Sequence, residues 1–250
     1  MLGFTLAFLM GMSLGLLGGG GSIITVPVLV YAMGMDPKIS IALSLAIVGA
    51  TSLLGVYWHF KSRNVNFKIA AFLGPIAMGG TFLGVKLSVF LSGQVQLVLF
   101  ALIMLAASLF MFKNNKALPK TTPEKKINFL FLSLGGVILG TITGLVGVGG
   151  GFLIVPALVF LTGVRMKQAV GTSLLIISLN SLSGFAGYLN IVEIPWGFLA
   201  KFTLCSGIGI FVGTYLVRFV KQQQLKTAFA IFLLAMGAFI IFKNKEVFLA

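Results

Sequence analysis

The sequence predicts an all-α polytopic membrane protein made of two homologous halves, and two observations lead to that prediction. Of its 250 residues, 58% are hydrophobic and only 9% are charged, whereas a soluble domain of this size carries about a quarter charged residues. Two similar segments, Gly11–Pro27 and Gly140–Pro156, lie 129 residues apart, and each interrupts an apolar stretch with a run of glycines. Apolar stretches joined by short loops fill nearly the whole chain, so no separate soluble domain is expected.

Each half contains five apolar segments, separated by turn-forming or charged residues. They predict helices at about 2–17, 22–34, 40–60, 67–91 and 95–112 in the first half, and at about 129–147, 152–163, 168–190, 196–220 and 225–242 in the second. The chain therefore divides into a first membrane repeat, 1–112, a basic linker, 113–128, and a second membrane repeat, 129–250. The linker holds five lysines, two prolines and one acidic residue, and is the expected hinge.

The similarity of the halves continues beyond the glycine runs. At the constant offset of 129, 18 of the 45 positions from Gly11 to Gly55 are identical, without a gap. The identities include Gly15/Gly144, Gly18/Gly147, Gly20/Gly149, Gly21/Gly150, Pro27/Pro156, Gly34/Gly163, Lys38/Lys167, Ser44/Ser173, Ser52/Ser181 and Gly55/Gly184. Biased composition explains some of these matches but not so many at one offset.

The second segment of each half is too short to cross a bilayer. A helix over Ser22–Gly34 is about 20 Å long, against about 30 Å of hydrocarbon. In one interpretation the glycines break a single span, which gives four spans per half and parallel repeats. In the other the chain enters the membrane, turns at the glycines and returns, which gives an odd number of passes and inverted repeats. The total is eight to ten membrane segments.

The distribution of positive charge favours inverted repeats. Under the odd count, one side of the membrane carries 13 Lys and Arg residues and the other carries three, whereas the even count gives 10 against 6. Membrane proteins keep such residues on the cytoplasmic side. We therefore expect the linker in the cytoplasm and both termini outside. The net charge of +14 is thus explained by basic residues in the cytoplasmic loops of a membrane protein, and no nucleic-acid partner is expected.

The glycine runs are the first candidate binding site. A helix that begins in mid-membrane has free backbone N–H groups and the positive end of its dipole at its start, and glycines let a ligand approach closely, which together suit an anion. Ser22 is a candidate N-cap. Glycines also let helices pack closely, and we expect only that role for Gly11/Gly15 and Gly80/Gly84. The substrate-binding residues predicted here are Gly18, Gly19, Gly20, Gly21, Ser22, Gly147, Gly149, Gly150 and Gly151.

The third segment of each half carries polar side chains at depth. Ser44, Thr172 and Ser173 are the predicted substrate contacts among them, although hydrogen bonding between helices is the common role of such residues in membranes. Thr51, Ser52, Asn180 and Ser181 share this pattern. His59, between two aromatic residues, predicts an anchor at the membrane interface. Lys86 and Lys201 lie within spans, where an anion-attracting role competes with snorkelling to the interface.

Several classes of protein are disfavoured. The four acidic residues, Asp36, Glu124, Glu193 and Glu246, all lie in loops or tails, so a proton relay of intramembrane carboxylates is missing. One histidine and one cysteine do not supply the usual catalytic or metal-binding sets, so no enzyme activity, cofactor or metal is expected. An acid-poor, basic membrane protein suits anions better than cations.

The motifs also resemble a known family. Gly15–Leu29 reads G-L-L-G-G-G-G-S-I-I-T-V-P-V-L, Gly144–Leu158 reads G-L-V-G-V-G-G-G-F-L-I-V-P-A-L, and Ala169–Leu175 reads A-V-G-T-S-L-L. Together these resemble the sulfite exporter TauE/SafE family over nearly the whole chain. The resemblance implies a bacterial inner-membrane permease that moves sulfite, sulfonates or other small organosulfur or carboxylate anions. In the first half Ala42-Leu43-Ser44-Leu45 replaces G-T-S-L, which departs from the family pattern.

The expected function is therefore secondary transport of a small anion, with alternating access at the glycine-rich breaks. The alternative is an anion channel or facilitator in which backbone groups line a continuous pore. The expected partners are the small anionic substrate and the lipid bilayer.

Overall fold

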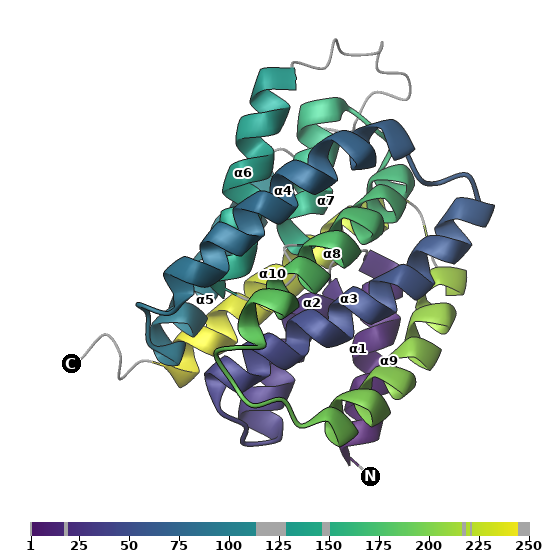
Figure 1. Ribbon diagram of the computed structural model, residues 1–250. Coiled ribbons are helices and arrows are strands. Elements are labelled where there is room, and N and C mark those ends of the chain that lie inside the picture. Colours follow the sequence, from purple (N-terminus) through teal and green to yellow (C-terminus); the bar gives the residue numbers. More distant parts are fainter. Residues whose placement is uncertain are drawn as a thin grey trace.

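The computed structural model describes residues 2–17, 20–113, 129–146, 151–216, 219–220 and 222–244. Within those residues it contains ten α-helices, one short π-helix and no strand. The elements are α1 (Leu2–Leu17), α2 (Gly20–Pro27), η1 (Val28–Ala32), α3 (Pro37–Lys61), α4 (Phe67–Ser88), α5 (Gly93–Lys113), α6 (Phe129–Val146), α7 (Gly151–Thr162), α8 (Met166–Tyr188), α9 (Trp196–Leu216) and α10 (Gln222–Lys243) (Figure 1). The all-helical prediction is confirmed. Helices α3, α4, α5, α8 and α9 are each long and apolar enough to cross a membrane.

Local sequence explains most helix boundaries. Asp36 caps α3 by accepting hydrogen bonds from the N–H groups of Lys38 and Ile39, at 2.8 and 3.2 Å, and Asn66 caps α4 in the same way. Gly34 and Gly163, which occupy matching positions of the repeat, end the short helices with φ of 68° and 71°. Glycine adopts this left-handed conformation without steric cost.

A π-helix follows the first of the two matching prolines. Pro27 lies inside the α2–η1 segment with helical φ and ψ of −57° and −39°, but proline has no N–H to donate to the preceding turn. The missing hydrogen bond accompanies the switch from α-helix to the π-helix η1. Pro156 lies within α7, which is α-helical along its whole length. The sequence did not distinguish these two outcomes.

Helix directions show how each half is folded. Glycine contacts place α1 parallel to α9, and contacts between α3 and α9 also run in parallel, so α1 and α3 point the same way. The chain must therefore come back between them through α2 and η1. Consistently, Gly3 at the start of α1 lies beside Met33, just after η1. Helices α6 and α8 also share a direction, because both run parallel to α4. By contrast α3 and α8, which match in the repeat, run antiparallel.

The strongest helix pairings exchange elements between the halves. Helix α1 packs most extensively against α9, and α6 packs most extensively against α4. These contacts are backbone to backbone: a Cβ added at Gly11 would lie 1.9 Å from the Ser206 carbonyl oxygen, and one at Gly84 would lie 2.1 Å from that of Thr141. The predicted close-packing role of Gly11/Gly15 and Gly80/Gly84 is confirmed. Their partners on α9 and α6 also carry glycines, Gly209, Gly213, Gly140 and Gly144.

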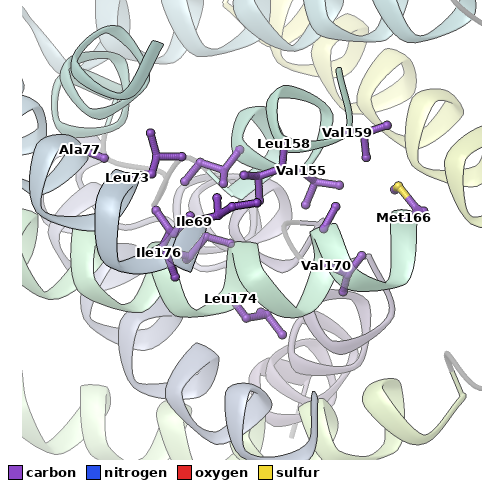
Figure 2. Close-up of a cluster of buried hydrophobic side chains, with 14 of the residues drawn as sticks. Ile69, Leu73, Ala77, Val155, Leu158, Val159, Met166, Val170, Leu174 and Ile176 are labelled. Carbon is purple, nitrogen blue, oxygen red and sulfur yellow. The ribbon is translucent and has the colours of Figure 1, made fainter. Parts of the chain in front are cut away.

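Three buried apolar clusters divide the molecule. One joins α1, η1, α3 and α9, and we call these elements, with α2, the first bundle. A second cluster is built mainly by α4, α7 and α8, with α6 beside them, and these four helices form the second bundle (Figure 2). A third cluster surrounds the antiparallel pair α5 and α10. Helices α3 and α8 contact each other at the boundary between the two bundles.

Candidate functional site

The first described residues of the two short helices belong to the two glycine runs. Gly20 is the first residue of α2, and Gly151 is the first residue of α7. Gly20, Gly21 and Ser22 form the first described turn of α2, and their backbone is helical. The side chain of Ser22, the candidate N-cap, lies outside the described part of the chain, so its capping role stays a prediction.

The remaining glycines of the predicted site, Gly18, Gly19, Gly147, Gly149 and Gly150, lie outside the described residues. The helices that follow them can be compared directly. Helices α2 and α7 contact each other, and apolar side chains on both, Ile23, Val26, Ile154 and Val155, are fully or almost fully buried. The structure thus brings together the two short helices that the two runs precede. A role of the runs in binding stays a prediction.

A narrow hollow lies beside α2 inside the first bundle. Its free volume is about 160 Å³, none of it wide enough for a water molecule, and its walls come from α1, α2, α3 and α9. Three hydroxyl residues line it, Thr25, Thr51 and Ser206. Two of these hydroxyls already donate to backbone carbonyls: Thr51 Oγ1 to Ile47 at 2.6 Å and Ser206 Oγ to Ala7 at 3.0 Å. The hollow is mainly apolar, because Met10, Leu14, Ile47 and Val48 supply most of its remaining wall.

The three predicted hydroxyl contacts differ in their surroundings. Ser44 Oγ is fully buried and has no hydrogen-bond partner among the described residues. Ser173 Oγ donates to the Val170 carbonyl at 2.8 Å. Thr172 Oγ1 accepts a hydrogen bond from the Asn66 N–H at 2.9 Å. Ser44 is therefore the predicted contact with the most unused hydrogen-bonding capacity.

The Gly171-Thr172 pair has a structural role that the sequence did not reveal. A Cβ at Gly171 would lie 2.3 Å from the Asn64 carbonyl oxygen, so only glycine lets the α3–α4 loop pack this closely on α8. The hydrogen bond from Asn66 to Thr172 then holds the end of that loop. Ala42 and Leu43 occupy the matching positions of the first half. The role of glycine and threonine in holding the α3–α4 loop is therefore specific to the second half.

Other buried polar residues also have side-chain atoms without a hydrogen-bond partner in the described part of the chain, and among them Ser40, Ser52, Asn180 and Ser181 have no exposed surface. They were not among the predicted site residues. The only hint in the sequence was that Ser52 and Ser181 are identical residues at matching positions of the repeat. Serine hydroxyls in helices usually donate to a carbonyl of the preceding turn, and the sequence does not show which hydroxyls lack that hydrogen bond.

The predicted accessory residues lie away from the helix breaks. Lys86 and Lys201 are exposed near helix ends, and Lys86 Nζ lies 5.1 Å from the centre of the Phe82 ring. His59 is only 2% exposed, so the prediction of an interfacial anchor is wrong. Its two aromatic neighbours point elsewhere because successive helical residues are turned by about 100°. Phe60, for example, is 57% exposed.

Charge divides the two ends of the molecule. Contacts between Gly3 and Met33, and between Gly93 and Pro37, bring helix ends together at one end. The α3–α4 loop and the start of α8 meet at the other (Figure 1). The second end carries the basic residues Lys61, Arg63, Lys68, Lys113, Arg165 and Lys167, whereas Lys38, Lys86, Lys201 and Lys243 lie toward the first, among the residues that the structure describes.

Long apolar helices, two short helices that meet inside, and halves that exchange partners define a multi-pass helical membrane protein of the transporter class. The model of the sulfite exporter TauE/SafE family matches residues 3–240. The chain belongs to this family.

Its relatives carry names of the same kind. A probable membrane transporter protein of Xylella fastidiosa is 31% identical over 241 residues, which cover 94% of this chain and 92% of the relative. The probable membrane transporter protein YdhB of Bacillus subtilis is 26% identical over 227 residues, covering 88% and 91% of the two chains. No solved structure matches the chain significantly.

Proposed function

We propose that this protein is a secondary transporter that moves a small anion across the bacterial inner membrane by alternating access. The proposed substrates are sulfite, a sulfonate or a related organosulfur or carboxylate anion, as the family name and the basic, acid-poor composition suggest. In this proposal the N–H groups of the two glycine runs bind the anion, and Ser44, Thr172 and Ser173 add hydroxyls.

One observation carries the proposal: two short helices begin at glycine runs and contact each other inside the protein. Eight residues of α2 and twelve of α7 are each too few to span about 30 Å of hydrocarbon, even with the five residues of η1 added to α2. The start of each short helix then lies inside the bilayer rather than at its surface. Free N–H groups and the helix dipole favour an anion at such a helix start.

We further propose that the two halves are inverted repeats. The antiparallel course of the matching helices α3 and α8 supports this, as does the return of the chain between α1 and α3. The basic end then faces the cytoplasm together with the linker 113–128, and both termini lie outside.

The moving units proposed for alternating access are the two bundles. Each bundle combines elements of both halves, because α1 is locked to α9 and α6 to α4 by backbone contacts at glycines. Most buried apolar residues of each cluster come from one bundle, although Leu14, Val48 and Ile210 of the first bundle also pack into the cluster of the second. The boundary between α3 and α8 is where they would tilt.

The test is anion flux in proteoliposomes that contain the purified protein. We expect uptake of radiolabelled sulfite or sulfoacetate by the wild type, and its loss in Gly20→Val and in Gly150→Val with unchanged insertion. Gly79→Ala is the matched control, since a Cβ there meets no atom within 4 Å. Wild-type uptake by both valine variants would refute the site. Resolvable single-channel currents in a planar bilayer would favour a channel instead.

A binding assay complements the flux assay. Ligand that binds only the folded state raises stability by about 2.7 kcal/mol at one hundred times its dissociation constant. We expect a selective rise in melting temperature with sulfur oxyanions among a panel that includes sulfate, chloride and short carboxylates. A rise of the same size with every salt would contradict a specific anion site.

A further inference from the structure

Polar side chains lie where helices α3 and α8 cross. Gly49 of α3 packs closely on α8 there, since a Cβ at Gly49 would lie 3.3 Å from the Ser181 Cβ and 3.2 Å from the Leu182 side chain. Ser52 lies three residues further along α3 and therefore on the same face as Gly49. Ser52 and Ser181 are matching residues of the repeat, so each half contributes the same side chain to the crossing.

Asn180 belongs to the same region. It lies next to Ser181, and it shares a helix face with Gly184 one turn further on. A Cβ at Gly184 would lie 3.2 Å from the Leu45 side chain of α3 and 3.1 Å from the Thr81 side chain of α4. Asn180 thus lies on the face of α8 that meets both α3 and α4.

The polar atoms of these residues are buried and unused. Ser52, Asn180 and Ser181 have no exposed surface. Neither hydroxyl, and neither the Oδ1 nor the Nδ2 of Asn180, has a hydrogen-bond partner among the described residues. The great majority of buried side-chain polar atoms in proteins are paired, so a group of such atoms at one helix crossing needs an explanation.

Neighbouring residues show that pairing within the helix is possible here. Thr51 Oγ1 donates to the Ile47 carbonyl at 2.6 Å, and Ser178 Oγ donates to the Leu175 carbonyl at 2.8 Å. Thr51 is the repeat counterpart of Asn180. At this position of the repeat the second half has Asn180, whose amide carries two N–H donors, whereas the first half has Thr51, whose hydroxyl is hydrogen-bonded within its own helix.

We propose that Asn180, Ser181 and Ser52 form a binding station for the transported anion at the boundary between the two bundles. This inference rests on the proposed function and adds a second site to it, apart from the helix starts. The Nδ2–H groups of Asn180 and the two hydroxyls donate hydrogen bonds to the oxygens of the anion. When the two bundles tilt against each other, a site at their boundary becomes accessible first from one side of the membrane and then from the other. Alternating access of this kind is what transport of a ligand requires.

Charge favours an anion over a cation at this station. The acidic residues within the described part of the chain are Asp36, which caps α3, and Glu193, which lies in the α8–α9 connection. Neither is near the crossing, where the side chains that the structure describes are neutral. Neutral donors suffice for an anion in a protein with a net charge of +14.

The experiment compares Asn180→Leu, Asn180→Ala and Ser178→Ala in proteoliposomes with sulfite and sulfoacetate as probes. Leucine keeps the branched shape of asparagine without its polar atoms. Loss of hydrogen bonds to a charged ligand weakens binding about tenfold to a hundredfold, so we expect a rise of that size in the apparent KM of both Asn180 variants. Ser178→Ala is the matched control on the same helix and should transport like the wild type.

Thermal stability separates a binding role from a structural one. Without ligand, we expect Asn180→Leu to melt at or above the wild-type temperature, because it removes an unpaired amide, and to lose the rise in melting temperature that sulfite causes. Wild-type transport by Asn180→Leu would overturn the station and leave the proposed function intact. A changed requirement for sodium with unchanged sulfite affinity would overturn it in favour of a cation site. Wild-type vesicles that move neither probe would refute the proposed function and the station together.

Discussion

Two glycines of α4 offer a sharp test of the backbone packing between α4 and α6. Gly84 faces α6, where an added Cβ would lie 2.1 Å from the Thr141 carbonyl oxygen and 2.8 Å from the Leu145 nitrogen. Gly79, five residues earlier on the same helix, is exposed and has no atom within 4 Å of its added Cβ. Alanine at the two positions therefore adds the same methyl group to opposite environments.

The expected energies differ in sign. Real Cβ atoms essentially never come within 3.0 Å of another atom of this kind, so Gly84→Ala must separate the helices by roughly 1 Å, since a backbone oxygen cannot rotate away. Overpacking of this kind costs about 1–3 kcal/mol, against which alanine returns about 1 kcal/mol of helix propensity. The free energy of unfolding should fall by up to about 2 kcal/mol in Gly84→Ala and rise by up to about 1 kcal/mol in Gly79→Ala.

Melting temperature in detergent measures the difference. Cys205 is the sole cysteine of the sequence and is half-buried in α9, so a thiol-reactive dye reports unfolding through a single group. At about 2–4 °C per kcal/mol for a chain of this size, Gly84→Ala should melt up to about 8 °C below the wild type and Gly79→Ala up to about 4 °C above it. Equal melting of the two variants would refute the backbone contact between α4 and α6.

Two further predictions concern hydrogen bonds at helix ends. Asp36→Ala should lower the free energy of unfolding by about 0.5–2 kcal/mol, because the N–H groups of Lys38 and Ile39 lose their acceptor, whereas Asp36→Asn should melt within a degree or two of the wild type; equal losses in both variants would contradict the capping role. Thr172→Val should speed hydrogen exchange of the Asn66 amide about tenfold, since a hydrogen bond contributes about 1 kcal/mol, while Thr172→Ser keeps the acceptor and the slow exchange. An Asn66 amide that exchanges equally fast in both proteins would show that Thr172 does not hold the loop.

Sequence alone predicted the helices well but not their partners. Each apolar segment ends at residues with clear local effects, such as Asp36 before α3 and Gly163 after α7, so the boundaries agree to within a few residues. The repeat says which residues correspond, but correspondence is not contact. Gly11 and Gly15 indicated close packing, yet nothing local shows that their partner is α9, because that choice depends on the arrangement of all the helices.

The candidate site was predictable to a lesser degree. The glycine runs predicted where α2 and α7 lie in the sequence, and Gly20 and Gly151 are the first described residues of these helices. His59 was misjudged because its neighbours in the sequence are aromatic, whereas burial in a helix depends on residues three and four positions away. Hydrogen bonding could not be predicted either: Thr51 and Asn180 match in the repeat, but only Thr51 satisfies itself within its own helix.

The exchange of helices between the halves also constrains the order of assembly during synthesis. Helix α1 ends at Leu17, but its main partner α9 begins only at Trp196. At 5–20 residues per second, a ribosome needs roughly 10–40 s to make the intervening chain. For that time the glycine face of α1 has no backbone to pack against, whereas α4 waits only for α6. The second bundle can therefore assemble before the first. The first repeat made alone would lack α9, the helix that completes the first bundle.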